Sequence, residues 1–556
     1  MCSSDLGYRF GGWTVNGAPA GTANPLVTTA TQGLQVEASF NYTLQVLHYY
    51  AESGLVGTTT APILGALVDR FDDQHANTLV VAEGDTFIPG PWLVAGADPS
   101  FNRLLHAGTF TGAADTTATP MGRADIAIMN LLGTAVSALG NHEFDLGSPV
   151  LAGAFFPSTS ATVGSWSGAR FPFITANLDF SADSALRGRV DASIGGTGGA
   201  LAGQEVTAIQ GKVAPYAVKT LNGERIGLVG ATTWDLLVKS SPNGTVPRRD
   251  ADPATSELQE AAAQLQGAVD ALRATGVNKI IQVDQLDSLG RNKALAGLVS
   301  GIDIVVAGGG HELMKDGTDA VGPYPGHTEP GADGYPIRTT GADGKPVLIV
   351  TTDAEFTYLG RLVVDFDANG ELVLGTLDEA VNGAYSADEA TLRAAYGTTA
   401  PASEIVAGSA IGAGVQRIAG AIDAIVRAKE GTVYGYTSVY LEGDRVFGRS
   451  EEVNLGDVTA DANAWKARGA LGLNDNLAVF SLKNGGGLRA SVGSVTADGS
   501  KVPPAGVAGV KPAGAVSLLD VENALRFDNK LMVCEFTPTG LLAVLNYAAG
   551  LAAGTG

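Results

Sequence analysis

Short apolar runs that end in glycine and a polar residue are the feature that most constrains this fold. Three such runs stop at Gly84-Asp85, at Gly140-Asn141-His142-Glu143 and at Gly308-Gly309-Gly310-His311. Runs of this kind are typical of strands buried on both faces, and helical patterns such as 256–274 lie between strand-like segments. The alternation predicts an α/β domain, in which polar residues just past the carboxyl ends of strands build the site.

The same pattern of apolar residues predicts where strands and helices lie along the chain. We expect strands at 42–47, 77–83, 135–139, 173–178, 226–230, 279–283, 302–307 and 347–350, a hairpin over 358–374, and helices at 61–71, 124–132, 256–274, 293–299 and 541–553. Residues 388–430 are rich in alanine with helical periodicity, and we interpret them as a helical linker. No run of 18 apolar residues occurs, so we expect no transmembrane segment.

Charge and cysteine content narrow the class of protein. The chain has 556 residues and a formal net charge of -22, which disfavours nucleic-acid polymers and anionic membranes as partners. A small phosphate ester held at a local metal site remains compatible with that charge, and we expect a monomer. Cys2 and Cys534 are too few for a disulfide framework. So few cysteines fit either a reducing compartment or a disulfide-free bacterial protein of the periplasm or the exterior, and the many glycines and few Lys and Arg residues favour the second.

The first residues do not resemble a targeting segment. Met1–Leu6 has neither a basic region nor an apolar region, so it is not a signal peptide. We interpret these six residues as an artefact of sequence assembly. We expect the true N-terminus, with any signal peptide, to be lost.

The polar residues after the apolar runs suit phosphate-ester chemistry. Asp85 could bridge two divalent ions, and the side-chain oxygen of Asn141 could bind one of them. His142 could donate a proton to a leaving oxygen, and Asp145 could orient its ring and hold its charged form. Each fragment alone also has a structural interpretation, since a Gly-Asp pair usually forms a turn and Asn141 could cap a helix.

Taken together, the motifs resemble a known family. The loop Gly140–Gly147, with Gly84-Asp85 upstream, is similar to the signature of the calcineurin-like metallophosphoesterases, in particular the bacterial 5′-nucleotidase branch. Later segments at 452–462, 484–489 and 527–529 resemble the C-terminal nucleotide-binding domain of that branch. The resemblance covers about residues 42 to 550, with the motifs in the family's order.

The resemblance implies a fold and a division into domains. The implied fold is α/β, with a four-layer α/β/β/α sandwich as the metallophosphoesterase domain and a separate α/β nucleotide-binding domain. We predict a leader at 1–40, the metallophosphoesterase domain at 41–380, a helical linker at 381–432 and the C-terminal domain at 433–556. Since the family's C-terminal domain continues further, we expect this last domain to be incomplete.

It also implies roles for residues near the strand ends. Asp85 would be the bridging metal ligand, Asn141 would bind the second metal and His311 would bind the first. Gln285 stands where the family has a metal-binding histidine, and it would be a poor ligand. The implied cofactor is a divalent metal such as Zn or Mn.

The remaining implied roles concern catalysis and substrate. His142 and Asp145 would form the catalytic dyad. In the second half of the chain, Arg489 would contact the phosphate or the nucleotide, Phe527 would stack on the base and Asn529 would form a hydrogen bond to it. Asn484 and Gly486 belong to the same nucleotide-binding motif.

The chain departs from the family at four ligand positions. Ala51 and Ser53 stand where family members carry an Asp-x-His motif, Gln285 replaces a histidine, and Gly309 replaces the first histidine of a Gly-His-x-His motif. Alanine, serine and glycine side chains are not normal ligands of divalent metals. We therefore expect fewer or weaker metal sites than the family's two, with help from Glu52, Asp284 or Asp287.

These observations leave three functional hypotheses open. The first is a metal-dependent hydrolase acting on nucleotides or related small phosphate esters, in nucleotide catabolism. The alternative is an impaired or inactive secreted relative that keeps the fold and the nucleotide pocket. A third is a rebuilt mononuclear site with a different substrate preference.

Overall fold

The computed structural model describes most of the chain, in two compact units. It describes residues 7–24, 26–29, 33–191, 205–249, 255–319, 321–324, 332–473, 478–496, 498–527 and 529–554. Unit 1 comprises Met1–Ile88, Gly96–Val321 and Gly331–Ala421, and unit 2 comprises Pro89–Ala95, Gly322–Pro330 and Ile422–Gly556. The predicted linker and domain boundaries stay predictions. The predicted artefact at Met1–Leu6 lies outside the described residues.

Unit 1 contains a large mixed sheet. Within the described residues, its order is β10 (Val213–Ala214), β8 (Phe173–Ile174), β5 (Val136–Ala138), β4 (Thr78–Ala82), β3 (Val36–Tyr49), β1 (Tyr8–Val15) and β2 (Ala18–Pro19), and β20 (Tyr358–Phe366) joins β3 to β21 (Gly383–Ser386). Strands β3, β4, β5, β8 and β10 run parallel, whereas β1 and β20 pair antiparallel with β3. The carboxyl ends of β3, β4 and β5 therefore lie at one edge of this sheet.

A second sheet of unit 1 has a parallel centre. Its order is β11 (Tyr216–Leu221), β12 (Glu224–Val229), β14 (Lys279–Gln285), β15 (Ile304–Gly308), β19 (Pro346–Val350) and β18 (Ile337–Thr340). The four central strands, from β12 to β19, are parallel, and β11 and β18 are antiparallel edge strands. Shorter described pairs are β9 (Leu178–Asp179) with β13 (Val246–Pro247), β6 (Ser158–Ser160) with β7 (Gly164–Trp166), and β16 (Met314–Lys315) with β17 (Ala332–Asp333).

Helices surround the sheets of unit 1. They are α1 (Gly57–Asp72), α3 (Phe101–Leu105), α4 (Arg123–Leu131), α5 (Ser148–Phe155), α6 (Leu236–Lys239), α7 (Glu257–Arg273), α8 (Leu289–Ala296), α9 (Glu389–Tyr396) and α10 (Ala402–Gly408). Helix α7 begins where the sequence predicts it, because Ser256 and Gln259 form a reciprocal capping box. Helix α11 (Ala410–Arg427) carries the chain from unit 1 into unit 2.

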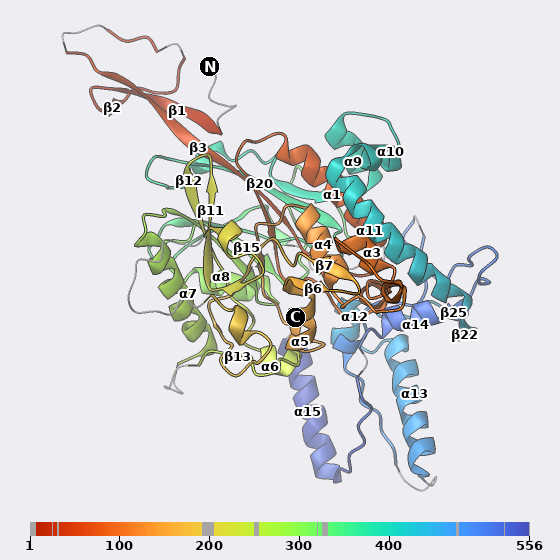
Figure 1. Ribbon diagram of the computed structural model, residues 1–556. Coiled ribbons are helices and arrows are strands. Elements are labelled where there is room, and N and C mark those ends of the chain that lie inside the picture. The colour runs from red at the N-terminus through yellow and green to blue at the C-terminus, as the bar shows by residue number, and fades with distance from the viewer. Residues whose placement is uncertain are drawn as a thin grey trace. The chain divides into compact units, whose positions relative to one another are not determined.

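The main core of unit 1 lies between its two sheets. Val46 and Val81 of the first sheet and Leu228, Val283 and Val306 of the second belong to one buried cluster. A second cluster lies between the other face of the second sheet and helices α7 and α8. In Figure 1, α7 and α8 lie on one side of the paired sheets, and α1 and α4 lie on the other. This order of layers confirms the predicted α/β/β/α sandwich.

Two predicted strand assignments differ from the structure. The segment 173–178 forms two short strands, β8 and β9, because Asn177 bonds to Thr232 with both polar atoms and turns the chain between them. The predicted hairpin is only partly formed. β20 meets Leu372 in a single bridge, and its long antiparallel partners are β3 and β21.

Unit 2 is smaller and contains few strands. Its helices are α2 (Pro91–Ala95), α12 (Arg445–Ser450), α13 (Asn454–Leu471), α14 (Leu518–Ala524) and α15 (Pro538–Gly554), and its strand pairs are β22 (Val433–Tyr436) with β25 (Ala515–Ser517) and β23 (Ser494–Val495) with β24 (Lys501–Val502). Val453, Leu455, Leu488, Val492 and Ala524 form its described buried cluster. In the part of the chain that the structure describes, no single helix is long and apolar enough to cross a membrane.

His75 gives unit 1 a pH-dependent stability. Burial, and then the charges of Arg361 and Arg9, lower the pKa of His75 from 6.5 to about 4. The folded chain therefore keeps this ring neutral where the unfolded chain already protonates it. Stability should fall as pH falls through the window from 6.5 to about 4, since only the unfolded state binds the proton there. His75→Gln should lose less stability than the wild type across this window in urea unfolding, and equal losses would contradict the prediction.

Candidate active site at the carboxyl ends of the sheets

Loops from both sheets of unit 1 meet at the carboxyl ends of parallel strands. Asp85 follows β4, Asn141 and His142 follow β5, and Gln285 ends β14. Three of the four predicted metal ligands, Asp85, Asn141 and Gln285, are buried and share hydrogen bonds. The structure thus brings together most of the residues that the sequence places at strand ends.

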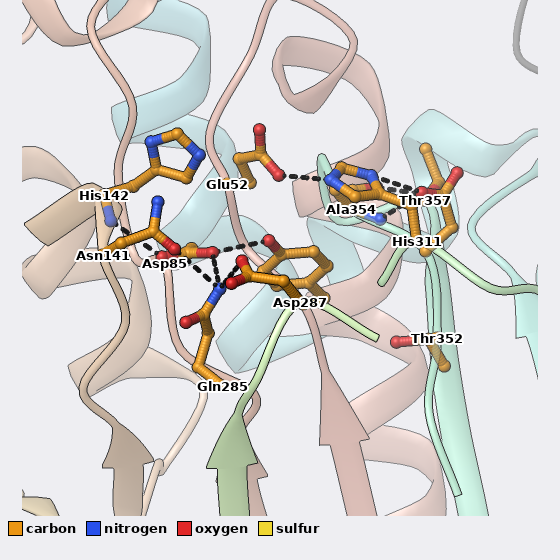
Figure 2. A network of polar contacts seen from close by, with 12 residues as sticks. Glu52, Asp85, Asn141, His142, Gln285, Asp287, His311, Thr352, Ala354 and Thr357 are labelled. Carbon is orange, nitrogen blue, oxygen red and sulfur yellow. Dashed lines mark hydrogen bonds and ion pairs between the residues drawn. The ribbon is translucent and has the colours of Figure 1, made fainter. Parts of the chain in front are cut away.

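The Gln285 side chain lies at the centre of this cluster. Its Nε2 atom is 2.6 Å from Asp85 Oδ2, 3.1 Å from Asn141 Oδ1 and 2.9 Å from Asp287 Oδ1 (Figure 2). Three side-chain oxygens therefore lie around one amide nitrogen, whose two N–H groups are shared among the three acceptors. Asp284, the residue just before Gln285 on β14, faces elsewhere, since its carboxylate accepts from Ala231 N and from Asn292.

Asp85 is held by donors from two further segments. The Tyr50 hydroxyl donates to Asp85 Oδ2 at 2.8 Å, and the backbone N–H of His142 donates to Asp85 Oδ1 at 2.9 Å. Burial raises the pKa of Asp85, while the nearby His142 charge acts in the opposite direction. With the Gln285 contact, this carboxylate accepts hydrogen bonds on both oxygens, which fixes its orientation.

His142 and Asp145 form a close pair beside this cluster. His142 Nδ1 lies 2.6 Å from Asp145 Oδ2, and Ser240 Oγ donates to Asp145 Oδ1 at 2.8 Å. Burial alone would lower the pKa of His142, but the charges of Asp145, Asp85 and Glu52 together raise it to about 9. The His142 side chain keeps 14% exposure. The imidazole is thus charged at neutral pH and accessible from solvent.

His311 is paired on both ring nitrogens. Its Nε2 lies 2.8 Å from Glu52 Oε2, and its Nδ1 lies 3.1 Å from Asp353 Oδ1 (Figure 2). The ring also packs edge-on against Tyr50, with centroids 5.2 Å apart. Figure 2 shows His311 and Glu52 as a second group, and Tyr50 joins it to the Asp85 cluster through the hydrogen bond described above.

Positions where the family carries other ligands hold small residues. Ala51 and Ser53 are buried, and the Ser53 hydroxyl donates to the carbonyl oxygen of Thr86. Gly309 has a φ of +89°, and a Cβ atom there would lie 2.5 Å from Gln285 Nε2. In the described segments, no three or more His, Cys, Asp or Glu side chains come together as a metal site.

Backbone strain is concentrated at this site. Glu52, Asp85, Asp287 and His311 all have positive φ values, of 30°, 45°, 64° and 62°. Side chains other than glycine rarely adopt this region, and such strain persists where the surrounding structure enforces it. Strained residues of this kind gather at functional sites, which supports this cluster as the candidate active site.

Glu143 is a residue whose role the sequence analysis did not identify. Its carboxylate is buried and accepts hydrogen bonds from Thr86 N and from Gly140 N, the latter at 2.8 Å. It therefore joins the loop after β4 to the loop after β5. The glutamate inside a glycine-rich loop could have predicted this role. A carboxylate buried in such a loop needs hydrogen-bond donors, and the loop offers mainly backbone N–H groups.

The predicted nucleotide-binding residues lie in unit 2. The Arg489 guanidinium lies over the Phe527 ring at 5.8 Å, and Arg489 N donates to Ala524 O. Asn484 Oδ1 accepts from Gly486 N at 3.1 Å, which shapes the glycine turn before Arg489. Asn529 is exposed, and its neighbour Asp528 lies outside the described residues. Arg489 and Phe527 are thus brought together as a cation–π pair.

Comparison with known proteins identifies relatives of this chain, although no protein-family model matches it. The trifunctional nucleotide phosphoesterase protein YfkN of Bacillus subtilis is 28% identical over 451 residues, covering 79% of this chain and 25% of YfkN. A snake venom 5′-nucleotidase of Gloydius brevicauda is 27% identical over 372 residues, covering 67% of this chain and 51% of the relative. The chain thus spans about half or less of these curated relatives.

A solved structure is similar across most of the fold. The 5′-nucleotidase precursor of Thermus thermophilus aligns with a TM-score of 0.59 at 25% identity, covering 88% of this chain and 74% of that one. The alignment supports the sandwich architecture at the level of the whole fold.

Removal of the Glu143 carboxylate should destabilise both loops. Glu143→Ala leaves two buried N–H groups without their acceptors, at a cost of about 1–3 kcal/mol for each. Glu143→Gln should cost less, because its amide oxygen can still accept from one of the two N–H groups. Thermal unfolding of the wild type and both variants measures the order, and a Gln variant less stable than the Ala variant would contradict it.

Proposed function

Because the homologues of this chain are members of the 5′-nucleotidase and calcineurin-like phosphoesterase family, we propose that it is a phosphoric-ester hydrolase acting on nucleotides or related small phosphate esters. The observation that carries the proposal is the pair formed by His142 and Asp145 beside Asp85. The alternative of an inactive relative finds no support among these homologues, whose names describe enzymes.

In this proposal, His142 acts on the leaving group. Its Nδ1 is held by Asp145, so Nε2 is the ring atom that donates a proton to the leaving oxygen. The charge on the ring also stabilises negative charge that develops on the phosphoryl group. Ser240 fixes Asp145 from the other side, so that the imidazole keeps one orientation.

The proton of the attacking water needs a carboxylate acceptor. Among the carboxylates near Asp85, Asp287 keeps 13% exposure of its side chain, whereas Glu52 keeps 3%. Burial would raise the pKa of Asp287, but its ion pair with Lys239 lowers it. We propose Asp287 as the acceptor of the water's proton, because it is the more exposed of the two carboxylates; the Lys239 ion pair that keeps it ionised also makes it a weaker base.

Metal ions supply Lewis-acid chemistry in the relatives, which are metal-dependent phosphoesterases. The residues of this chain do not fit the family's two-metal centre. Asp85 Oδ2 and Asn141 Oδ1 accept hydrogen bonds from Gln285, the side chains at Ala51 and Gly309 carry no ligand atom, and the Ser53 hydroxyl is engaged with the carbonyl oxygen of Thr86. The proposal therefore depends on the protonated and ionised groups of the chain itself.

We assign recognition of the nucleoside to unit 2. A base can stack on Phe527, which contributes about 1–3 kcal/mol, and Arg489 next to it offers a positive charge to phosphate. Asn529 is exposed and offers an amide to the base edge. We also propose a periplasmic or extracellular location, which the precursor form of the Thermus relative favours.

Loss of the His142 imidazole tests the hydrolase directly. His142→Ala should lower kcat by about 10²–10⁴-fold on AMP, because proton donation to the alkoxide leaving oxygen is lost, and by less on p-nitrophenyl phosphate, whose phenolate leaves without a proton. His75→Gln is the matched control, since His75 precedes the amino end of β4, whereas Asp85 follows its carboxyl end. Full turnover in the His142 variant would contradict the role of His142 on which this proposal depends.

Recognition of the base can be measured separately. Phe527→Leu should raise KM for AMP by about 5- to 150-fold, the equivalent of one lost base stack. The KM for p-nitrophenyl phosphate in the same variant should stay at the wild-type value. Phe480→Leu is the control, because Phe480 is an exposed phenylalanine of the same unit. Equal effects on both substrates would show that Phe527 does not bind the base.

A further inference from the structure

We propose that two hydrogen-bonding groups of the chain, the Gln285 amide and the His311 imidazole, take the place of the two metal ions that the family resemblance implies for this site. The site is then held together without a resident transition-metal ion. The inference deepens the proposed function, and rests on it for the identity of the site.

Gln285 Nε2 has the surroundings of a cation. Two carboxylate oxygens and one amide oxygen, from Asp85, Asp287 and Asn141, lie between 2.6 and 3.1 Å from it. Among the described residues, Gln285 Oε1 has no hydrogen-bond partner. The three contacts of Nε2 therefore set the orientation of the amide, because the reverse orientation would place one oxygen against three others.

Gly309, which stands where the family has a histidine, belongs to the same arrangement. A Cβ atom at this position would lie 2.5 Å from Gln285 Nε2 and 2.8 Å from the backbone nitrogen of Asp287. A histidine at 309 would therefore displace the amide from the three oxygens. The glycine at 309 thus leaves free the space that the Gln285 amide occupies.

His311 lacks the free lone pair that a metal requires. Both of its ring nitrogens lie within 3.1 Å of a carboxylate oxygen, one from Glu52 and one from Asp353. A metal ion could bind either ring nitrogen only by displacing the carboxylate oxygen that faces it. The imidazole thus lies between two buried carboxylates of the chain.

The other oxygens of the cluster are also engaged by donors of the chain. Tyr50 and the backbone of His142 donate to Asp85, and Lys239 pairs with Asp287 at 2.5 Å. A divalent ion would have to displace several of these charge-assisted hydrogen bonds at once. Amide oxygens hold transition metals less well than imidazole and carboxylate ligands do, so the exchange is unfavourable.

The first test measures metal in the wild-type protein. After equilibrium dialysis against Mn²⁺ or Zn²⁺ and removal of free metal, elemental analysis should find well under one equivalent per chain. The thermal midpoint should be the same in about 1 mM EDTA as in about 1 mM Mn²⁺, because a ligand that does not bind the native state does not stabilise it. Near-stoichiometric metal, or a lower midpoint in EDTA, would overturn the inference.

The second test turns the donor into an acceptor. Gln285→Glu keeps the shape of the side chain but places a carboxylate oxygen where Nε2 meets three oxygens. The variant should be destabilised in EDTA and should regain its midpoint in Mn²⁺, with about one equivalent of metal bound. A variant as stable as the wild type in EDTA, with no metal uptake, would show that Nε2 does not stand at a cation position.

Gln282→Glu is the matched control on the same strand. Gln282 is also buried and donates to a carboxylate, that of Asp284, but no cluster of three oxygens surrounds it. It should lose stability without rescue by Mn²⁺. Rescue of both variants would mean that metal acts elsewhere and would contradict the assignment. If Gln285→Glu folds in neither condition, the metal content of the wild-type protein alone tests the inference.

Hydrolysis in EDTA separates this inference from the proposed function. Turnover of p-nitrophenyl phosphate that persists in EDTA supports both. Turnover that appears only with added metal overturns the inference and leaves the hydrolase assignment intact. A metal-free wild type that hydrolyses neither AMP nor the chromogenic ester overturns the proposed function and leaves the inference standing.

Discussion

The buried carboxylate of Glu143 is the contact on which the rest of the site depends. It accepts the N–H groups of Thr86 and Gly140, and so fixes the loop that follows β4 against the loop that follows β5. Asp85 lies on the first loop and His142 on the second, and the backbone of His142 then donates to Asp85. The functional side chains are placed through backbone contacts, so their positions depend little on their own flexibility.

The site combines strained backbone with closely paired charges. Glu52, Asp85, Asp287 and His311 adopt positive φ values, and each costs free energy that the paired sheets must supply. The imidazoles and Lys239 lie against carboxylates, which offsets the cost of burying those charges. The large core between the two sheets provides the rigidity that holds this arrangement.

The sequence predicts the fold better than it predicts the details of the site. Apolar strand runs are local signals that predict the α/β class, and the capping box at Ser256 starts helix α7, whereas the sandwich is what the family resemblance implies. The strand ends also locate Asp85, Asn141 and Gln285 at one edge. The donor role of Gln285 and the bridging role of Glu143 depend on distances between residues far apart in the chain. The division of 173–178 into two strands likewise depends on Asn177 and Thr232, a long-range contact.

The close approach of position 309 to the Gln285 amide has a consequence for how such a site can evolve. A histidine at 309 alone would collide with Nε2, and a histidine at 285 alone would find its neighbouring ligand position empty. Neither single replacement restores a pair of ligands, so the two positions show epistasis and are expected to change together. The present arrangement is therefore a separate local optimum among sequences of this fold, and single-residue steps do not lead directly from it to the two-metal form.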